Sequence, residues 1–168
     1  AASDVYKRQA DYGIADLWPE AVLKEAKTKK EHITKEIDAL ETFPFVTIDG
    51  EDAKDFDDAI FCEFSDHGFH LKVAIADVSF YVKEGSALDL EAAKRTTSVY
   101  MPRKVVPMLP EKLSNELCSL QPNKRRRCLC IEMDFDKDGY INSYTFHRGI
   151  IKSVARLTYT VVEKQLIN

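Results

Sequence analysis

From residue 43 to residue 62 the chain reads Phe43-Pro44-Phe45-Val46-Thr47-Ile48-Asp49-Gly50-Glu51-Asp52-Ala53-Lys54-Asp55-Phe56-Asp57-Asp58-Ala59-Ile60-Phe61-Cys62. Two apolar, β-prone runs flank an acidic segment, in which four aspartates form the pattern D-x5-D-x-D-D: Asp49, Asp55, Asp57 and Asp58. The first run predicts a strand that ends at Asp49, and the second predicts a strand that begins at Asp58. The other acids are expected on the connecting loop, and loops that leave a rigid strand often carry catalytic groups.

The density of carboxylates in this segment favours a metal site. Carboxylates so close together repel one another, and an unpaired cluster resists full ionisation. A hard cation such as Mg²⁺, with Mn²⁺ as an alternative, relieves that repulsion and prefers oxygen ligands. An acidic run is more often a solvated loop. Phe56 among the acids and the apolar run after Asp58 hold the loop between core segments, which favours the metal site.

Composition is that of an ordinary globular domain: 168 residues, of which 45% are hydrophobic and 31% charged. No apolar run approaches the length of a membrane span, so no membrane partner is expected. The net charge of −4 argues against a wholly basic surface, but Lys124-Arg125-Arg126-Arg127 is a local basic run that could receive a phosphate backbone.

The four cysteines lack a zinc-ligand spacing. They are interpreted as reduced core thiols of a cytoplasmic protein, with Cys128 and Cys130 on one face of a strand: Cys62, Cys118, Cys128 and Cys130. No feature of the sequence specifies an oligomeric state.

Hydrophobic periodicity predicts an α+β fold, with a mixed, mainly antiparallel sheet and flanking helices. Val22, Ala26, Ile33, Ile37 and Leu40 recur at near-helical spacing and predict one amphipathic helix over residues 19–40. Two strands are expected at 58–64 and 68–78, joined by a turn at 65–68 that contains His67. In the second strand, the face with Phe69, Leu71, Val73 and Ile75 is expected to be buried, and His70 to point outward.

Four further elements are predicted downstream. Ser86-x-x-Asp89 has the form of a capping box and opens a helix to about Arg95. Residues 100–110 contain three prolines and predict an extended surface loop. Residues 128–135 and 141–150 predict a hairpin, and Thr160-x-x-Glu163 predicts the start of a last helix.

Asp134-Phe135-Asp136-Lys137-Asp138-Gly139-Tyr140-Ile141 matches the first eight positions of an EF-hand loop. Position twelve is Thr145 instead of the glutamate that supplies two calcium contacts. The flanking residues also alternate as in strands, so a hairpin turn is the better interpretation.

Several ordered blocks carry a resemblance to a known family. The stretch Val46–Ala59 resembles the active-site signature of the RNase II / RNase R family of 3′→5′ exoribonucleases, and is nearer to its RNase R branch. Further blocks follow in the family's order: Val73–Ser79, Thr97–Pro102, Val106–Glu111 with Leu113–Asn115, and Ala155–Thr160.

The resemblance implies a hydrolase that releases 5′-nucleoside monophosphates processively from the 3′ end of single-stranded RNA. It implies that Asp49, Asp55, Asp57 and Asp58 hold Mg²⁺, with Asp57 most important for the chemistry. Tyr100 stands where the family places an aromatic clamp for the terminal base. Phe80 stands where relatives often carry a polar ring, so a hydrogen bond from that position is not expected.

The expected organisation has three parts. Residues 1–9 lack periodicity and are interpreted as a non-native leader, and residues 10–40 as a linker with the amphipathic helix. Residues 41–168 are interpreted as the N-terminal part of an incomplete RNB catalytic domain. The family's later arginine and acid, and its flanking cold-shock and S1 domains, have no counterpart here. The fragment alone is therefore expected to be inactive. The alternative is a metal- and RNA-binding fragment without turnover.

Overall fold

The computed structural model describes residues 11–33, 38–101 and 104–167, and the chain forms two compact units. One unit comprises the described parts of Ala1–Lys30 and Ser79–Ser114, and the other those of Glu31–Val78 and Asn115–Asn168. The expected leader and Ile37 lie outside the described residues.

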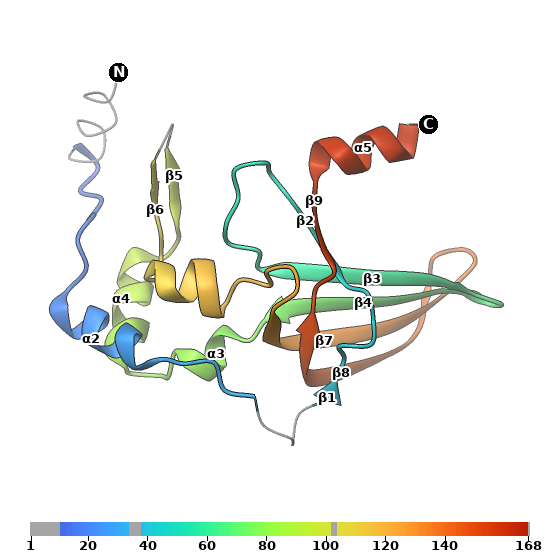
Figure 1. Ribbon diagram of the computed structural model, residues 1–168, viewed down its shortest axis with the longest axis horizontal. Coiled ribbons are helices and arrows are strands. Elements are labelled where there is room, and N and C mark those ends of the chain that lie inside the picture. The colour runs from blue at the N-terminus through green and yellow to red at the C-terminus, as the bar shows by residue number, and fades with distance from the viewer. Residues whose placement is uncertain (1–10, 34–37, 102–103, 168) are drawn as a thin grey trace. The chain divides into compact units, whose positions relative to one another are not determined.

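The second unit is built on a seven-stranded sheet with the order β1-β8-β7-β4-β3-β2-β9 (Figure 1). Its central strands pair antiparallel, whereas β1 joins β8 and β9 joins β2 in parallel. The strands are β1 (Asp38–Ala39), β2 (Val46–Asp49), β3 (Asp58–Ser65), β4 (Gly68–Ala76), β7 (Arg125–Asp136), β8 (Ile141–Lys152) and β9 (Ala155–Thr158). The predicted α+β class with a mainly antiparallel sheet is confirmed.

The turn that resembles an EF-hand joins β7 to β8, as predicted. The Asp136 carboxylate accepts hydrogen bonds from the backbone N–H groups of Asp138 and Tyr140, each at 2.9 Å. Gly139 has a φ of 86°, a left-handed conformation that glycine adopts without a steric cost. The strands continue on both sides, so these aspartates organise a hairpin.

The prediction of the buried face of β4 was wrong. Ile75 is 47% exposed, whereas Ala74 is 0% exposed and Lys72 only 2% exposed. The Lys72 ammonium can be buried because it pairs with the Glu132 carboxylate and lies 4.3 Å from the centroid of the Phe43 ring. His70 is on this same face, with its ring nitrogens 3.1 Å from Glu132 and 2.7 Å from Asp134. The alternation of the two faces along β4 was predicted correctly. The face that carries Lys72 and His70 is the buried one, because their charges are paired.

The first unit contains α2 (Glu20–Thr28), α4 (Ala87–Arg95) and the hairpin of β5 (Val99–Met101) and β6 (Lys104–Val106). The capping box is confirmed: the Ser86 hydroxyl accepts from the Asp89 N–H at 3.3 Å. The Asp89 carboxylate accepts from the Gly85 N–H at 2.9 Å. Part of the region predicted as an extended loop, up to Val106, belongs to the β5–β6 hairpin instead, whereas residues 107–110 form no strand or helix. Three short elements complete the chain: α3 (Val78–Tyr81), the π-helical segment Lys112–Leu117 and α5 (Tyr159–Ile167).

Helix α2 ends at Thr28, so the prediction of one helix over 19–40 was wrong. Glu31 pairs with the Arg126 guanidinium at 2.9 Å, and the His32 carbonyl accepts from Arg127 at 3.1 Å. Leu40 is buried outside any helix, and its N–H donates to the Ile150 carbonyl of the sheet at 2.9 Å. Contacts with distant strands therefore replace the later helical turns.

Two smaller expectations, the cap of the last helix and the burial of all four cysteines, were wrong. Helix α5 is capped by Thr158, whose hydroxyl accepts from the Val161 N–H at 3.3 Å, so Thr160 is not the cap. Cys62 is exposed, whereas the other three cysteines are buried as expected. Within the described ranges, no helix is long and apolar enough to cross a membrane.

Candidate active site on the acidic loop

The four predicted aspartates lie at and between the ends of two neighbouring strands. Asp49 is the last residue of β2 and is in register with Thr158 of β9. Asp58 is the first residue of β3 and is in register with Ile75 of β4. Asp55 and Asp57 lie on the connection between these strands, residues 50–57, which we call the acidic loop. The expected strand–loop–strand arrangement is confirmed.

The C-terminal half of the acidic loop is tied to the segment around Ser119. The buried Ser119 hydroxyl accepts from the Phe56 N–H at 3.1 Å and donates to the Lys54 carbonyl at 2.9 Å. The Leu120 N–H donates to the Phe56 carbonyl at 2.8 Å, and the Ala76 N–H donates to the Asp57 carbonyl at 2.9 Å. Phe56 itself is only 7% exposed, so the loop is anchored in the core as its sequence suggested.

The N-terminal half is held by Arg156 of β9. Its guanidinium donates to the Gly50 carbonyl at 2.6 Å and also to the carbonyl of Glu51. The same group lies 5.6 Å from the centroid of the Phe56 ring. A turn hydrogen bond from the Ala53 N–H to the Gly50 carbonyl, 3.2 Å long, completes this half.

Electrostatic coupling shows that the four carboxylates influence one another. Burial raises the pKa of Asp49, Asp58 and Asp55 raise it further, and Arg156 opposes the change. Burial, together with repulsion from Asp55, Asp58 and Asp49, raises the pKa of Asp57 to about 6. As a residue Asp57 is solvent-exposed, so water screens part of this repulsion. The acids therefore form a site that is electrostatically unfavourable without a cation.

The neighbouring Cys118 thiol is also affected by negative charges at this site. Burial, with smaller contributions from Asp57 and Asp77, raises the pKa of Cys118 to about 12. Cys118 is therefore a neutral, unreactive thiol beside the acids, because only the thiolate is a nucleophile or metal ligand.

The donor set fits a hard divalent cation by its chemistry. All four side chains offer carboxylate oxygens, and one of them, Asp49 Oδ2, is buried with no hydrogen-bond partner among the described residues. Across residues 11–33, 38–101 and 104–167, no three His, Cys, Asp or Glu side chains are grouped closely enough to hold a metal ion. Asp55 and Asp58 are thus near enough to raise the pKa values of Asp49 and Asp57, but the four described side chains are not arranged as a coordination shell.

Tyr100 lies on β5 and is 66% exposed. It belongs to the first compact unit, whereas the four aspartates belong to the second. Phe80, also in the first unit, packs edge-on against Tyr81, with ring centroids 5.0 Å apart.

The basic run at residues 124–127 is only half exposed: Lys124 and Arg125 are exposed, whereas the two arginines after them are buried. Arg126 and Arg127 are each 6% exposed. Arg126 donates to the carbonyls of Glu116 and Ser119 at 2.9 and 3.0 Å, and Arg127 lies 3.9 Å from the buried Asp77 carboxylate. These arginines stabilise the fold, because a buried cation requires such partners.

Sequence reasoning missed Ser119 and Arg156, the two residues whose side chains hold the acidic loop. Both residues lie more than 60 positions from the acidic loop in the chain. A serine or an arginine by itself does not indicate such a contact. The only signal was that Arg156 falls within one of the blocks that resemble the exoribonuclease family.

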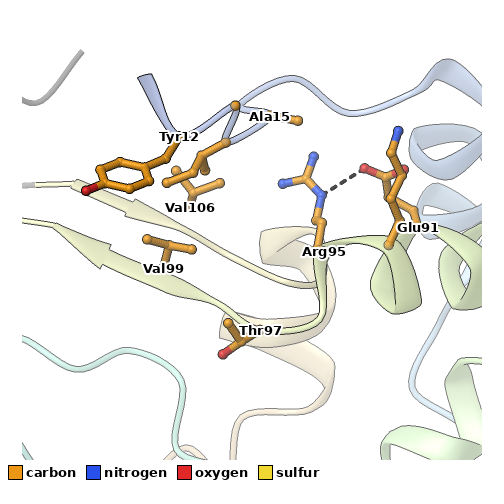
Figure 2. Close-up of a pocket in the computed structure, with 10 residues that line it drawn as sticks. Tyr12, Ala15, Glu91, Arg95, Thr97, Val99 and Val106 are labelled. Atoms are coloured by element: carbon orange, nitrogen blue, oxygen red, sulfur yellow. Dashed lines mark hydrogen bonds and ion pairs between the residues drawn. The ribbon is translucent and has the colours of Figure 1, made fainter. Parts of the chain in front are cut away.

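A cavity of about 240 Å³ lies in the first unit (Figure 2). Its most polar wall is the Arg95–Glu91 ion pair at 2.9 Å. Arg95 also donates to the carbonyls of Leu17 and Pro107 and stacks on Trp18, 3.6 Å from the ring centroid. Arg95 thus fastens residues 17–18 to α4. None of the predicted site residues lines the cavity.

Comparisons with known proteins agree with the fold. The model of the RNB domain matches residues 37–167. Ribonuclease R of Acidithiobacillus ferrooxidans is 51% identical over 156 residues, covering 90% of this chain and 36% of the relative. Ribonuclease R of Escherichia coli K12 is 50% identical over 154 residues, covering 89% of this chain and 19% of the relative.

A solved structure of Mycoplasma genitalium RNase R, in complex with ribose-methylated single-stranded RNA, superposes with a TM-score of 0.90 at 38% identity. The match covers 95% of this chain and 26% of that protein. The chain thus spans about a third or less of the length of these relatives. Since the family model covers most of its residues, the chain belongs to the RNB domain family.

Proposed function

We propose that the acidic loop and the two strand ends beside it form the hydrolytic centre of a 3′→5′ exoribonuclease. The proposal concerns the parent protein, by which we mean a full-length protein that contains this chain. It would release 5′-nucleoside monophosphates from the 3′ end of single-stranded RNA. One observation carries it: four mutually repelling carboxylates lie on a loop anchored in the core and at the two strand ends beside it, in a chain about 50% identical to ribonucleases R.

Asp49, Asp55 and Asp58 would hold Mg²⁺, with Mn²⁺ as an alternative, because hard cations prefer carboxylate oxygens. When bound, the cation would act as a Lewis acid toward the phosphodiester and lower the pKa of its water. Asp57 would orient the attacking water through its carboxylate and contribute to holding the ion.

Tyr100 would stack against the terminal base of the RNA. Its exposure on β5 leaves the ring accessible, and stacking a base on an aromatic ring contributes roughly 1–3 kcal/mol whatever the base. Such tolerance suits an enzyme that removes nucleotides of every kind. The M. genitalium relative was solved with single-stranded RNA, which supports RNA as the partner class.

The function is tested by following 5′-labelled single-stranded RNA with the parent protein, with and without a chelator. With Mg²⁺ we expect a ladder that shortens from the 3′ end and 5′-monophosphates as products. Chelation should stop release, and added Mg²⁺ or Mn²⁺ should restore it. Equal degradation in excess chelator, or internal cleavage, would refute the proposal.

Tyr100→Ala in the parent protein should change the products and leave the metal requirement unchanged. Losing the stacking surface weakens the grip on the last nucleotides, so the undigested terminal fragment should differ in length. Tyr140→Ala is the matched control, because Tyr140 is also exposed, at 72%, but lies in the β7–β8 turn. If the Tyr100 variant gives the wild-type ladder, Tyr100 has no role in substrate binding.

A second candidate is a metal- and RNA-binding chain without turnover. The observation in its favour is that the chain spans only 36% and 19% of the lengths of the two ribonucleases R, so groups that complete their catalysis can lie outside the matched part. RNA binding by the parent protein without any product would support this candidate over the enzyme.

We also propose that the protein acts in the cytoplasm. All four cysteines are free in the described structure. Burial raises the pKa values of Cys118 and Cys128 to about 12 and that of Cys130 to about 11, which keeps these thiols neutral. Free buried thiols are typical of a reducing compartment. Fractionation of cells that express the parent protein tests this assignment.

A further inference from the structure

Arg156 reaches the acidic loop from a strand that carries none of the four aspartates. β9 pairs in parallel with β2, and this register sets Arg156 beside Thr47, two residues before Asp49. From there its guanidinium bonds the two consecutive carbonyls of Gly50 and Glu51 and lies over the Phe56 ring. One side chain therefore contacts both the beginning of the loop and Phe56 near its end.

These contacts use the properties of arginine. The guanidinium offers several donors in a rigid plane, so it can bond adjacent carbonyls while its face packs on an aromatic ring. The Nε of Arg156 is buried and has no hydrogen-bond partner among the described residues. The contacts made through its terminal nitrogen must therefore compensate for partial burial of a cation.

Resting on the function proposed above, we propose that Arg156 is a positioning residue, which fixes the backbone of the acidic loop before the cation arrives. A free loop of this length would lose conformational entropy when an ion ordered it, and a preformed loop avoids that loss. Ser119 fixes the other half through Lys54 and Phe56, so Arg156 supplies the restraint missing at the Gly50 end.

The test compares Arg156→Gln with wild type in the 168-residue chain by two readouts. The first is hydrogen exchange of the Ala53 and Phe56 amides without metal, since the Ala53 N–H donates to the Gly50 carbonyl and the Phe56 N–H to the Ser119 hydroxyl. We expect Arg156→Gln to lose protection at these amides while β4 and β7 keep theirs. The second is Mn²⁺ affinity by calorimetry, which should fall roughly 10–100-fold, as when other groups that orient metal ligands are removed.

Three further variants calibrate the comparison. Ser119→Ala removes the acceptor of the Phe56 N–H and should expose that amide directly. Arg125→Gln is the matched control, because Arg125 bonds Glu41 outside the loop and its loss changes the charge equally. Arg156→Lys keeps the charge but cannot bond both carbonyls while covering Phe56. Its amide protection and its Mn²⁺ affinity should therefore fall between those of wild type and Arg156→Gln.

Unchanged exchange and unchanged affinity in Arg156→Gln would overturn the inference. So would a general loss of protection that includes β4 and β7, because that would make Arg156 a fold residue only. If Arg156→Gln does not fold, Arg156→Lys is used in its place. Amide protection and Mn²⁺ affinity equal to those of wild type in Arg156→Lys would then overturn the inference. Failure of wild type to bind Mn²⁺ would refute the proposed metal site, while the exchange readout would still decide whether Arg156 holds the loop.

Discussion

Asp57→Asn in the parent protein should abolish nucleotide release and leave RNA binding nearly intact. The substitution keeps the shape of the side chain and removes its charge, so the attacking water loses the group that orients it and accepts its proton. Losses of this kind reduce rates by about 100-fold or more. Binding should survive because stacking and phosphate contacts do not involve this carboxylate.

The measurement is single-turnover release of 5′-monophosphates, with RNA affinity from a separate filter-binding titration. Asp52→Asn is the matched control, since Asp52 lies in the same loop, is exposed and falls outside the D-x5-D-x-D-D pattern. The control should retain its rate. A parallel fall of affinity and rate in Asp57→Asn, or equal losses in both variants, would remove Asp57 from its proposed role.

The isolated 168-residue chain should bind a divalent cation weakly and degrade little or no RNA. It spans only 36% of the A. ferrooxidans relative and 19% of the E. coli relative. The Arg156 guanidinium, which contacts the acidic loop, is engaged by the carbonyls of Gly50 and Glu51. The negative charge that develops on the phosphate would therefore not be stabilised by the later arginine that the family resemblance implies. Loss of one such group typically costs ~100-fold or more in rate.

This expectation is measured with purified chain and parent protein at equal concentration on the same 5′-labelled RNA. The chain should be kept dilute, because Tyr144 and Phe146 on one face of the sheet are 64% and 61% exposed and favour association. Robust Mg²⁺-dependent release of 5′-monophosphates by the chain would show that it contains the whole catalytic centre.

The placement of the acidic loop could be predicted because local sequence determines it. Apolar runs on both sides specify strands, so Asp49 and Asp58 had to lie at strand ends and Phe56 had to be buried. The Ser86 capping box and the turn after Asp136 are equally local, and the structure has both.

Elements that depend on distant partners could not be predicted in this way. Helix α2 ends at Thr28 because arginines about 95 positions later bond Glu31 and His32. The face of β4 with Lys72 is buried because Glu132 neutralises the ammonium, a pairing that the alternation pattern does not reveal. The contacts of Ser119 and Arg156 with the acidic loop also join segments far apart in sequence.

The central claim, that the acidic loop binds a metal, is tested most directly by titrating the 168-residue chain with Mn²⁺. Calorimetry would compare wild type with a variant that carries Asn at positions 49, 55, 57 and 58, and with Asp52→Asn. We expect saturable binding by wild type and by Asp52→Asn, and none by the fourfold variant. Equal binding by all three, or none by wild type, would contradict the assignment of this loop as a metal site.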